Sequence, residues 1–153
     1  MTRRRRDGNW ARNGTKSEFG YKFHSLIEKE YYFIRRFDTS TASLHDSQVD
    51  LSQKGETVYR DKGYFGTVPF ASMDKTMNRS VRGKPISTKD KRRNRAISRT
   101  RSLVERPFAV IKRVFHAGHV MVTIHLRVHA KNLFACFSYN LFKLVTVQKN
   151  HTV

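Results

Sequence analysis

The most apolar part of the chain, residues 130–147, constrains the fold more than any other feature. Its centre is the run LFACFSYNLFKLV, residues 133–145, in which Lys143 is the one charged side chain. A run of this length suits a buried helix better than a strand, because strands seldom exceed about eight residues. The sequence therefore predicts a core helix, with Cys136 and the phenylalanines of 133–145 buried. A chain of 153 residues is the size of one domain and can bury such a core.

Strand-like and helix-like patterns precede this helix. Residues 19–27 show mostly strand periodicity, and residues 31–39 predict an antiparallel partner after a turn at 28–30. Further along, we expect a short helix at 44–53, a strand running into a glycine-containing turn at 57–66, and a long helix at 97–115; residues 119–128 fit a strand and a helix equally well. This order of elements indicates a mixed α/β layer.

The charge of the chain points to a polyanionic partner. Lys and Arg number 31 against 12 Asp and Glu, which gives a formal charge of +19 and a pI near 10.7. Nucleic acid is the default partner for such a field, and an anionic membrane surface is second. Two basic segments stand out, a flexible arm at residues 1–18 containing Arg3–Arg6 and a loop at residues 79–96. The alternative interpretation of that loop is a solvated, disordered segment.

Several protein classes are disfavoured. The chain has no eighteen-residue apolar run and no signal-peptide core after its charged start, so we expect an intracellular protein without a membrane partner. Its one cysteine, Cys136, predicts no disulfide and a reducing compartment. The seven histidines are scattered without cysteine partners, so a structural zinc site is not expected.

One acid stands among cations in RSLVERPFAVIKR, residues 101–113. On a helix, Arg101, Glu105 and Lys112 fall in one narrow row beside the apolar stripe, away from the outer basic face. Pro107 should kink or restart this helix. Taken alone, Arg101 and Glu105 also fit an ordinary surface ion pair that contributes little to stability.

A second acid, Asp61, lies in VYRDKGYFG where the strand should end. Strand ends at the mouth of an α/β sheet commonly display catalytic groups. Two carboxylates can bind Mg²⁺ or Mn²⁺ and leave positions for water and a scissile phosphate. The alternative is that Asp61 serves as a turn or cap residue.

Four segments together resemble the DDE transposases of bacterial and archaeal insertion sequences, whose catalytic domain has a ribonuclease H-like fold. The segments are FGYKFH, RRFDTSTASLHDSQ, VYRDKGYFG and RTRSLVERPFAVIKRVF, and the resemblance covers roughly residues 7–147. It implies that Asp61 is the family's second metal-binding acid and Glu105 its last. Arg101 and Lys112 match the family's cations around that last acid, whereas Ser98 stands where the family has tyrosine.

The resemblance also implies an α/β domain, a ribonuclease H-like mixed sheet flanked by helices, at residues 19–150. The family's first acid lies on an opening strand upstream of the segment resembling FGYKFH, so we expect the chain to lack that strand and the domain that recognises element ends. Asp7 lies in the arm, and Asp38 and Asp46 lie in segments that are not the first-acid segment.

The implied activity is two-metal DNA cleavage and strand transfer at insertion-sequence ends, impaired here because the first acid is absent. The implied partners are Mg²⁺ or Mn²⁺, element ends, target DNA and further copies of the chain on DNA, with no small-molecule cofactor, in the prokaryotic cytoplasm at the nucleoid. The expected DNA contacts are Lys62, Arg79, Arg82, Lys84, Lys91, Arg92, Arg93 and Arg95. Two alternatives remain open, a basic DNA-binding remnant without catalysis and, less favoured, a basic RNA-binding protein.

Overall fold

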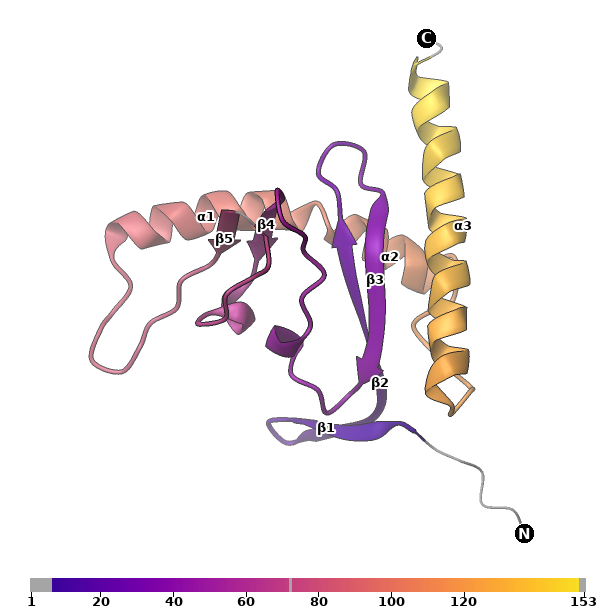
Figure 1. The fold of residues 1–153 in the computed structure, drawn as a ribbon, viewed down its shortest axis with the longest axis horizontal. Helices are drawn as coiled ribbons and strands as arrows, with labels where there is room; N and C mark the ends of the chain where they lie inside the picture. Colours follow the sequence, from indigo (N-terminus) through magenta and orange to yellow (C-terminus); the bar gives the residue numbers. More distant parts are fainter. Residues whose placement is uncertain (1–6, 72, 152–153) are drawn as a thin grey trace. The chain divides into compact units, whose positions relative to one another are not determined.

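The computed structural model describes residues 7–71 and 73–151 and shows a mixed α/β chain, as the order of sequence patterns predicts (Figure 1). Its elements are β1 Asn9–Asn13, β2 Lys16–Ile27, β3 Ile34–Thr41, the 3-10 helix η1 Asp46–Gln48, β4 Thr57–Arg60, the 3-10 helix η2 Lys62–Tyr64, β5 Met73–Thr76, α1 Thr88–Ser102, α2 Glu105–Arg113 and α3 His125–His151. They form two compact units. The first comprises the residues up to His45 and those from Pro107 onward, and the second comprises Asp46–Arg106.

An antiparallel sheet in the order β1-β2-β3 forms the first unit's framework. The predicted pair of antiparallel strands is therefore confirmed, but the second strand starts at Ile34 rather than at residue 31. The reason is the Glu28 carboxylate, which accepts hydrogen bonds from the backbone N–H groups of Glu30, Tyr31 and Phe33 at 2.7, 2.7 and 3.0 Å. These bonds hold residues 28–33 in a turn and delay the strand.

Residues 1–18 were expected to form a flexible arm, but the first strand, β1, already begins at Asn9 within that stretch. β1 pairs with the start of β2, from Asn9 opposite Gly20 to Asn13 opposite Lys16. The hairpin turns at Gly14, whose φ of 62° lies in the region that glycine tolerates. The predicted basic group Arg3–Arg6 lies outside the described residues.

Helix α3 supplies the core of the first unit and lies along β3 (Figure 1). The buried cluster consists of Ile34, Ile111, Ala135, Cys136 and Tyr139. Asn140 clamps the helix to β3, since its side chain accepts from the Ile34 N–H at 2.9 Å and donates to the Ile34 carbonyl at 3.0 Å. Cys136 is 5 % exposed and is therefore a core residue, as predicted, and this burial raises the pKa of its thiol to about 12.

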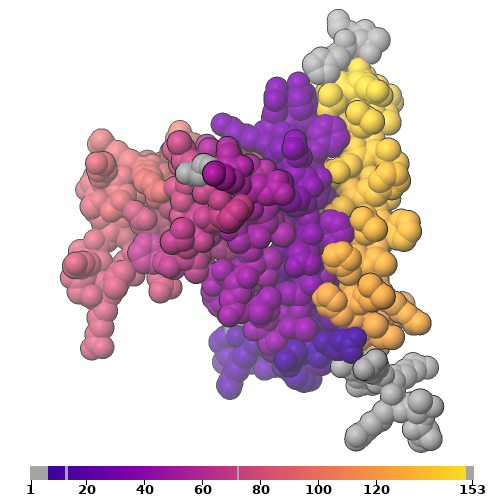
Figure 2. Space-filling model, in the orientation of Figure 1, coloured from indigo at the N-terminus to yellow at the C-terminus, as the bar shows by residue number. Residues whose placement is uncertain are grey.

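The prediction that all of 133–145 is core is wrong for half of the helix. Leu133, Phe134, Phe137 and Leu141 are 50, 69, 59 and 48 % exposed. The helix is apolar on two faces, and β3 covers one of them, which carries Val128, Asn132, Ala135, Cys136 and Tyr139. Side chains of α3, in yellow, accordingly form part of the molecular surface in Figure 2.

The second unit is built on a parallel pair, β4 and β5, in register from Thr57 opposite Met73 to Arg60 opposite Thr76. Helix α1 contacts β4. The strand at 57–60 was predicted, whereas β5 was not, because MDKT is short and polar and lacks an alternating pattern. Only η1 forms within the helix predicted at 44–53.

Two expectations about residues 79–115 are wrong. The basic loop expected at 79–96 ends at Ser87, whose side chain caps α1 by accepting from the Asp90 N–H at 3.1 Å. The long helix expected at 97–115 is broken between Ser102 and Glu105. Pro107 explains the break, because proline has no N–H for the Leu103 carbonyl and its ring clashes with that group.

The ambiguous segment 119–128 leads without regular structure into α3 at His125, whose N–H is accepted by Asp7 Oδ2 at 3.3 Å. Across residues 7–71 and 73–151, no helix combines the length and the apolar character needed to cross a membrane.

Candidate functional site

Asp61 directly follows β4 and caps the short helix η2. Its φ and ψ of −81° and −176° are extended, and its Oδ1 accepts a hydrogen bond from the Gly63 N–H at 2.8 Å. The cap fixes one carboxylate oxygen and leaves Oδ2 for another partner. Asp61 is therefore both the turn residue that the simpler interpretation expected and a strand-end carboxylate that is partly exposed to solvent.

Gly63 allows this close approach. A Cβ atom at this position would lie 3.0 Å from Asp61 Oδ1, closer than an ordinary van der Waals contact. The backbone of Gly63 is not left-handed, so the requirement for glycine here comes from space rather than from φ. The sequence Asp-Lys-Gly therefore encodes the direction of the Asp61 carboxylate.

Arg101 is the second partner of Asp61. Its Nη2 lies 3.7 Å from Asp61 Oδ2, and the two side chains are 36 and 44 % exposed. Solvent screens such a pair, so it adds little to stability, but it places a cation next to the carboxylate. The sequence predicted that Arg101 would accompany Glu105, whereas the structure pairs it with Asp61.

A shallow, open pocket of about 470 Å³ lies beside Asp61. Its lining consists of Asp61, Lys62 and Gly63 from the turn, Met77 after β5, and Asn94, Arg95 and Ser98 from α1. The pocket thus brings one carboxylate together with two cations, Lys62 and Arg95, and with Ser98, which stands at the tyrosine position of the family pattern. Such a combination suits a phosphate group approaching an acidic centre.

Glu105 and Lys112 lie on α2, apart from the helix that carries Arg101. Glu105 opens α2, where an acid interacts favourably with the helix dipole, and Lys112 lies in its last turn. Both side chains are exposed. The straight row of Arg101, Glu105 and Lys112 predicted on one continuous helix is therefore wrong, because the helix breaks between the first two.

The resemblance to the transposases implies a divalent-metal site, which the described residues can be checked against. Asp61 and Glu105 are the candidate ligands, but Asp61 Oδ2 faces the guanidinium of Arg101 rather than a second carboxylate. Within residues 7–71 and 73–151, no group of three or more His, Cys, Asp or Glu residues is placed to hold a metal ion. The donor set therefore does not by itself fit a two-metal centre.

The remaining candidate acids have other partners. Asp7 accepts from the N–H that opens α3. Asp38 accepts from the Thr39 N–H at 2.7 Å and lies 3.9 Å from His129 Nδ1. Asp46 lies in the first turn of η1.

The predicted DNA contacts differ in their surroundings. Lys62, Arg79, Arg82, Lys84, Lys91, Arg92 and Arg95 are exposed. Arg79 stacks over the Phe65 ring at 5.7 Å. Arg93 is half-buried and donates to the Thr76 carbonyl at 2.7 Å, so it ties α1 to β5.

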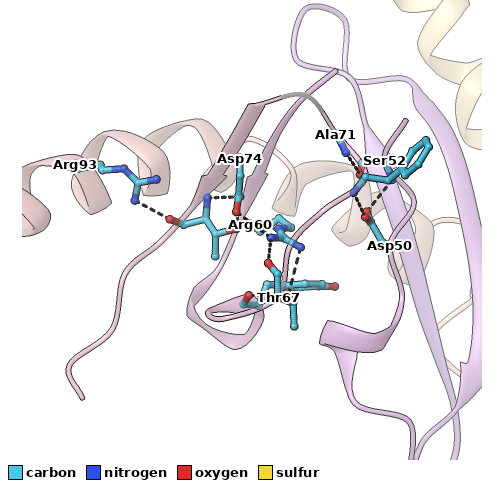
Figure 3. Close-up of polar contacts among 10 residues, drawn as sticks. Asp50, Ser52, Arg60, Thr67, Ala71, Asp74 and Arg93 are labelled. Carbon is cyan, nitrogen blue, oxygen red and sulfur yellow. Dashed lines mark hydrogen bonds and ion pairs between the residues drawn. The ribbon is translucent and has the colours of Figure 1, made fainter. Parts of the chain in front are cut away.

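Arg60, the residue before Asp61, is a structural centre that was not predicted from the sequence. Its guanidinium is buried and bonds to Thr67, Asp74 and Thr76 (Figure 3). The strand TVYR contains a pattern that indicates this burial, because residues two apart share a strand face and Val58 is apolar. A buried Val58 implies a buried Arg60.

Burial, hydrogen bonds and nearby charges shift two pKa values around this turn. Burial, followed by the nearby Asp46 and Asp61, raises the pKa of Tyr64 against the opposing effect of Arg60 and Arg101. For Asp50, burial would raise the pKa, but hydrogen bonds from Ser52 and Phe70 and the charge of Arg60 outweigh it and lower the value. Asp50 accepts from the Ser52 N–H at 2.9 Å and the Phe70 N–H at 2.6 Å, and so fastens the loop before β5 (Figure 3).

Comparison with known proteins gives two matches. The family model described as the transposase DDE domain matches residues 1–141. A transposase for insertion sequence element IS1106 from Neisseria meningitidis serogroup B is 26 % identical over 149 residues, covering 90 % of this chain and 51 % of that protein. The chain thus spans about half the length of this curated relative. No solved structure matches the chain.

Proposed function

Because the chain belongs to the transposase DDE domain family, we propose that it supplies part of the site that cuts DNA at insertion-sequence ends and joins those ends to target DNA. The observation that carries the proposal is the placement of Asp61. This carboxylate follows β4, is directed by a hydrogen bond from Gly63, and borders a pocket that contains Lys62 and Arg95. A strand-end acid next to cations is suited to phosphodiester chemistry.

We propose Asp61 and Glu105 as the metal-binding acids of this site. Transposases of this family generally use divalent metal ions, and Asp61 and Glu105 are the side chains that would contribute to holding Mg²⁺ or Mn²⁺. Among the described residues, no group of three or more potential ligands is placed to complete such a set. Lys62, Arg95 and Arg101 would contact the phosphates next to the reacting one, and Lys112 is the further cation that the family pattern implies.

DNA backbone would lie along the exposed cations of α1 and the preceding loop. Lys91, Arg92 and Arg95 are exposed on α1, and Arg79, Arg82 and Lys84 precede it. Contacts of this kind are independent of sequence and weaken with salt. A DNA substrate would place the protein in the prokaryotic cytoplasm at the nucleoid, and assembly of several copies on DNA stays a prediction.

The second candidate is a DNA-binding protein without catalysis. It is favoured by the charge of +19 together with the lack of a three-ligand cluster among the described residues. An RNA-binding role fits the charge equally well but does not explain the pocket beside Asp61. We expect strand transfer by the purified 153-residue chain to be negligible, because its described residues bring together no group of three or more side chains that could hold a metal ion.

Nicking of supercoiled plasmid DNA by the purified chain in Mg²⁺ or Mn²⁺ separates the two candidates. If the chain is catalytic, Asp61→Asn and Glu105→Gln abolish nicking, whereas the control Glu30→Gln, at an exposed acid in the turn after β2, retains it. Retarded DNA migration without nicking in either metal supports the second candidate and rejects the first.

A further inference from the structure

The guanidinium of Arg60 joins the strand β4 to two other parts of the second unit, the loop at Thr67 and the strand β5. Its Nε donates to Thr76 Oγ1 at 2.8 Å, and its Nη2 donates to the Thr67 carbonyl at 2.6 Å and to Asp74 Oδ2 at 3.1 Å (Figure 3). The Arg60 side chain is 9 % exposed. A buried guanidinium is costly unless its donors are satisfied, and here Asp74 balances the charge while two threonines accept hydrogen bonds.

These bonds close the loop that carries Asp61. Arg60 immediately precedes that loop, and Thr67, at its far end, is held through its carbonyl and by a longer 3.4 Å contact from Nη1 to Oγ1. Inside the loop, the Thr67 hydroxyl donates to the Tyr64 carbonyl at 2.8 Å. The Tyr64 ring lies under the guanidinium, with 5.3 Å between the Arg60 Cζ and the ring centroid.

The same guanidinium anchors the loop to rigid structure. Arg60 lies opposite Thr76 in the parallel pair, and its own carbonyl accepts from the Met77 N–H at 3.0 Å. Thr76 is in turn fixed by Arg93 of α1, which donates to the Thr76 carbonyl at 2.7 Å. The Arg60 side chain therefore fixes the position of the loop relative to β5 and, through Thr76, relative to α1.

We propose that Arg60 is a positioning residue for Asp61. The Asp61 carboxylate is directed from within the loop, by the Gly63 N–H, so its direction depends on the loop's conformation. Arg60 holds both ends of that loop and stacks on its middle. The inference rests on the proposed function for what Asp61 does, but the positioning itself is a property of this loop.

The role requires arginine. The guanidinium is a planar fork that donates in several fixed directions at once, whereas the lysine ammonium is a compact charge on a flexible stem. Arg60→Lys keeps the balance with Asp74 but cannot hold Thr67 and Thr76 together. Thr67→Val removes the hydroxyl contacts while leaving the buried guanidinium in place, so it loosens the loop without leaving an unpaired charge.

The test measures the Gly63 amide by NMR in the full 153-residue chain. In Arg60→Lys, we expect the Gly63 N–H to move upfield and to exchange roughly tenfold faster, because its hydrogen bond to Asp61 is no longer held. Thr67→Val should shift the same amide in the same direction but less. Amides of α1 and of β2–β3 keep their wild-type protection, and the control Arg35→Lys, at an exposed arginine on β3, changes none of them.

An unchanged Gly63 amide in both variants overturns the inference. Equal loss of protection across β4, β5 and α1 in Thr67→Val also overturns it, because that pattern means general destabilisation rather than positioning. If Arg60→Lys does not fold, the Gly63 amide of Thr67→Val alone decides between positioning and no positioning.

Plasmid nicking then tests the link to Asp61. We expect Arg60→Lys to nick on the order of 100-fold more slowly, the loss that a misplacement of about 1 Å can cause. If the wild-type chain does not nick DNA in either metal, the catalytic proposal fails. The chemical shift and exchange rate of the Gly63 N–H still test the positioning role of Arg60 in that case.

Discussion

Gly63 is the residue on which the geometry of Asp61 depends most directly. We predict that Gly63→Ala displaces the Asp61 carboxylate, because the new Cβ would lie 3.0 Å from Oδ1. The free energy of unfolding should change by less than about 1 kcal/mol, since alanine reduces the entropy of the unfolded chain while crowding the native turn. Nicking should fall at least as far as in Arg60→Lys. Urea unfolding and plasmid nicking measure the two effects separately.

Gly118→Ala is the matched control. A Cβ atom there would meet Lys112 at 3.5 Å or more, which is ordinary contact. We expect neither unfolding nor nicking to change. Wild-type nicking by Gly63→Ala would show that the cap does not set the carboxylate's direction.

At the residue scale, a residue's role could be predicted from the sequence when the residues it contacts lie close to it in the chain. Asp61 was placed correctly at the end of β4, because a strand and a glycine turn are local patterns. The partner of Arg101 was not predictable, since the pair with Asp61 joins residues 40 apart in sequence across a helix–turn contact. The burial of Arg60 could have been predicted, because Arg60 shares a strand face with the apolar Val58.

At the element scale, the N-terminus of α1 depends on Ser87. Its hydroxyl accepts from the Asp90 N–H at 3.1 Å and donates to Asp90 Oδ2 at 2.8 Å. We predict that Ser87→Ala destabilises the second unit by about 1 kcal/mol, the usual cost of a lost N-cap. Urea unfolding followed by signals from α1 measures this change, and Ser80→Ala, at an exposed position before the helix, is the control.

The same hydrogen bonds predict how α1 responds to acid. Hydrogen bonds from Ser87 and then Asn78 lower the pKa of Asp90, against a weaker effect of burial. A lowered pKa means that the stabilisation is fully present above the unfolded value of about 3.9 and is lost as the pH falls through the folded value. Amide exchange at residues 88–91 should therefore quicken below about pH 4 relative to pH 6. Exchange that is independent of pH after correction for the intrinsic rate would contradict the assignment.

Element boundaries followed from the sequence where one local signal dominated and failed where two competed. Residues 88–96 were expected to be loop because they are basic, but a good cap and an acid in the first turn start a helix there. Pro107 was recognised as a disruption, yet its effect falls four residues earlier, at the carbonyl it cannot serve. Helix α3 was predicted correctly as a helix, but the extent of its burial depends on β3, which no local pattern reports.

At the scale of the whole molecule, the proposed association with DNA depends on the charge of +19. We predict that the triple variant Lys91→Gln, Arg92→Gln, Arg95→Gln binds duplex DNA less tightly. The slope of log K against log salt should become shallower by up to about 0.9 for each phosphate that the variant no longer neutralises. Fluorescence anisotropy at several salt concentrations measures this slope.

The control removes three exposed charges elsewhere, in Lys16→Gln, Lys29→Gln, Arg35→Gln. Net charge falls equally in the two triple variants, so an equal change of slope in both would mean that affinity follows total charge rather than α1. A larger change in the α1 variant places the DNA on that helix.

The exposed face of α3 predicts the opposite response to salt. Leu133, Phe134, Phe137, Leu141 and Val145 are between 48 and 69 % exposed, and a helix that is apolar on two faces is normally covered on both. At low salt, repulsion between chains of charge +19 opposes contact between such faces, whereas added salt screens the repulsion and leaves the apolar attraction. Self-association should therefore rise with salt, as sedimentation velocity without DNA can measure.

Replacing Phe134 and Phe137 by serine should abolish that rise without unfolding the chain, because both side chains point away from the buried cluster. The control Val68→Ser, Met121→Ser removes side chains that are 92 and 88 % exposed but lie outside α3. If the control suppresses association as strongly, general surface hydrophobicity is responsible. If only the α3 variant does so, the attraction belongs to this helix, and conditions that weaken DNA binding are the ones that bring the helices together.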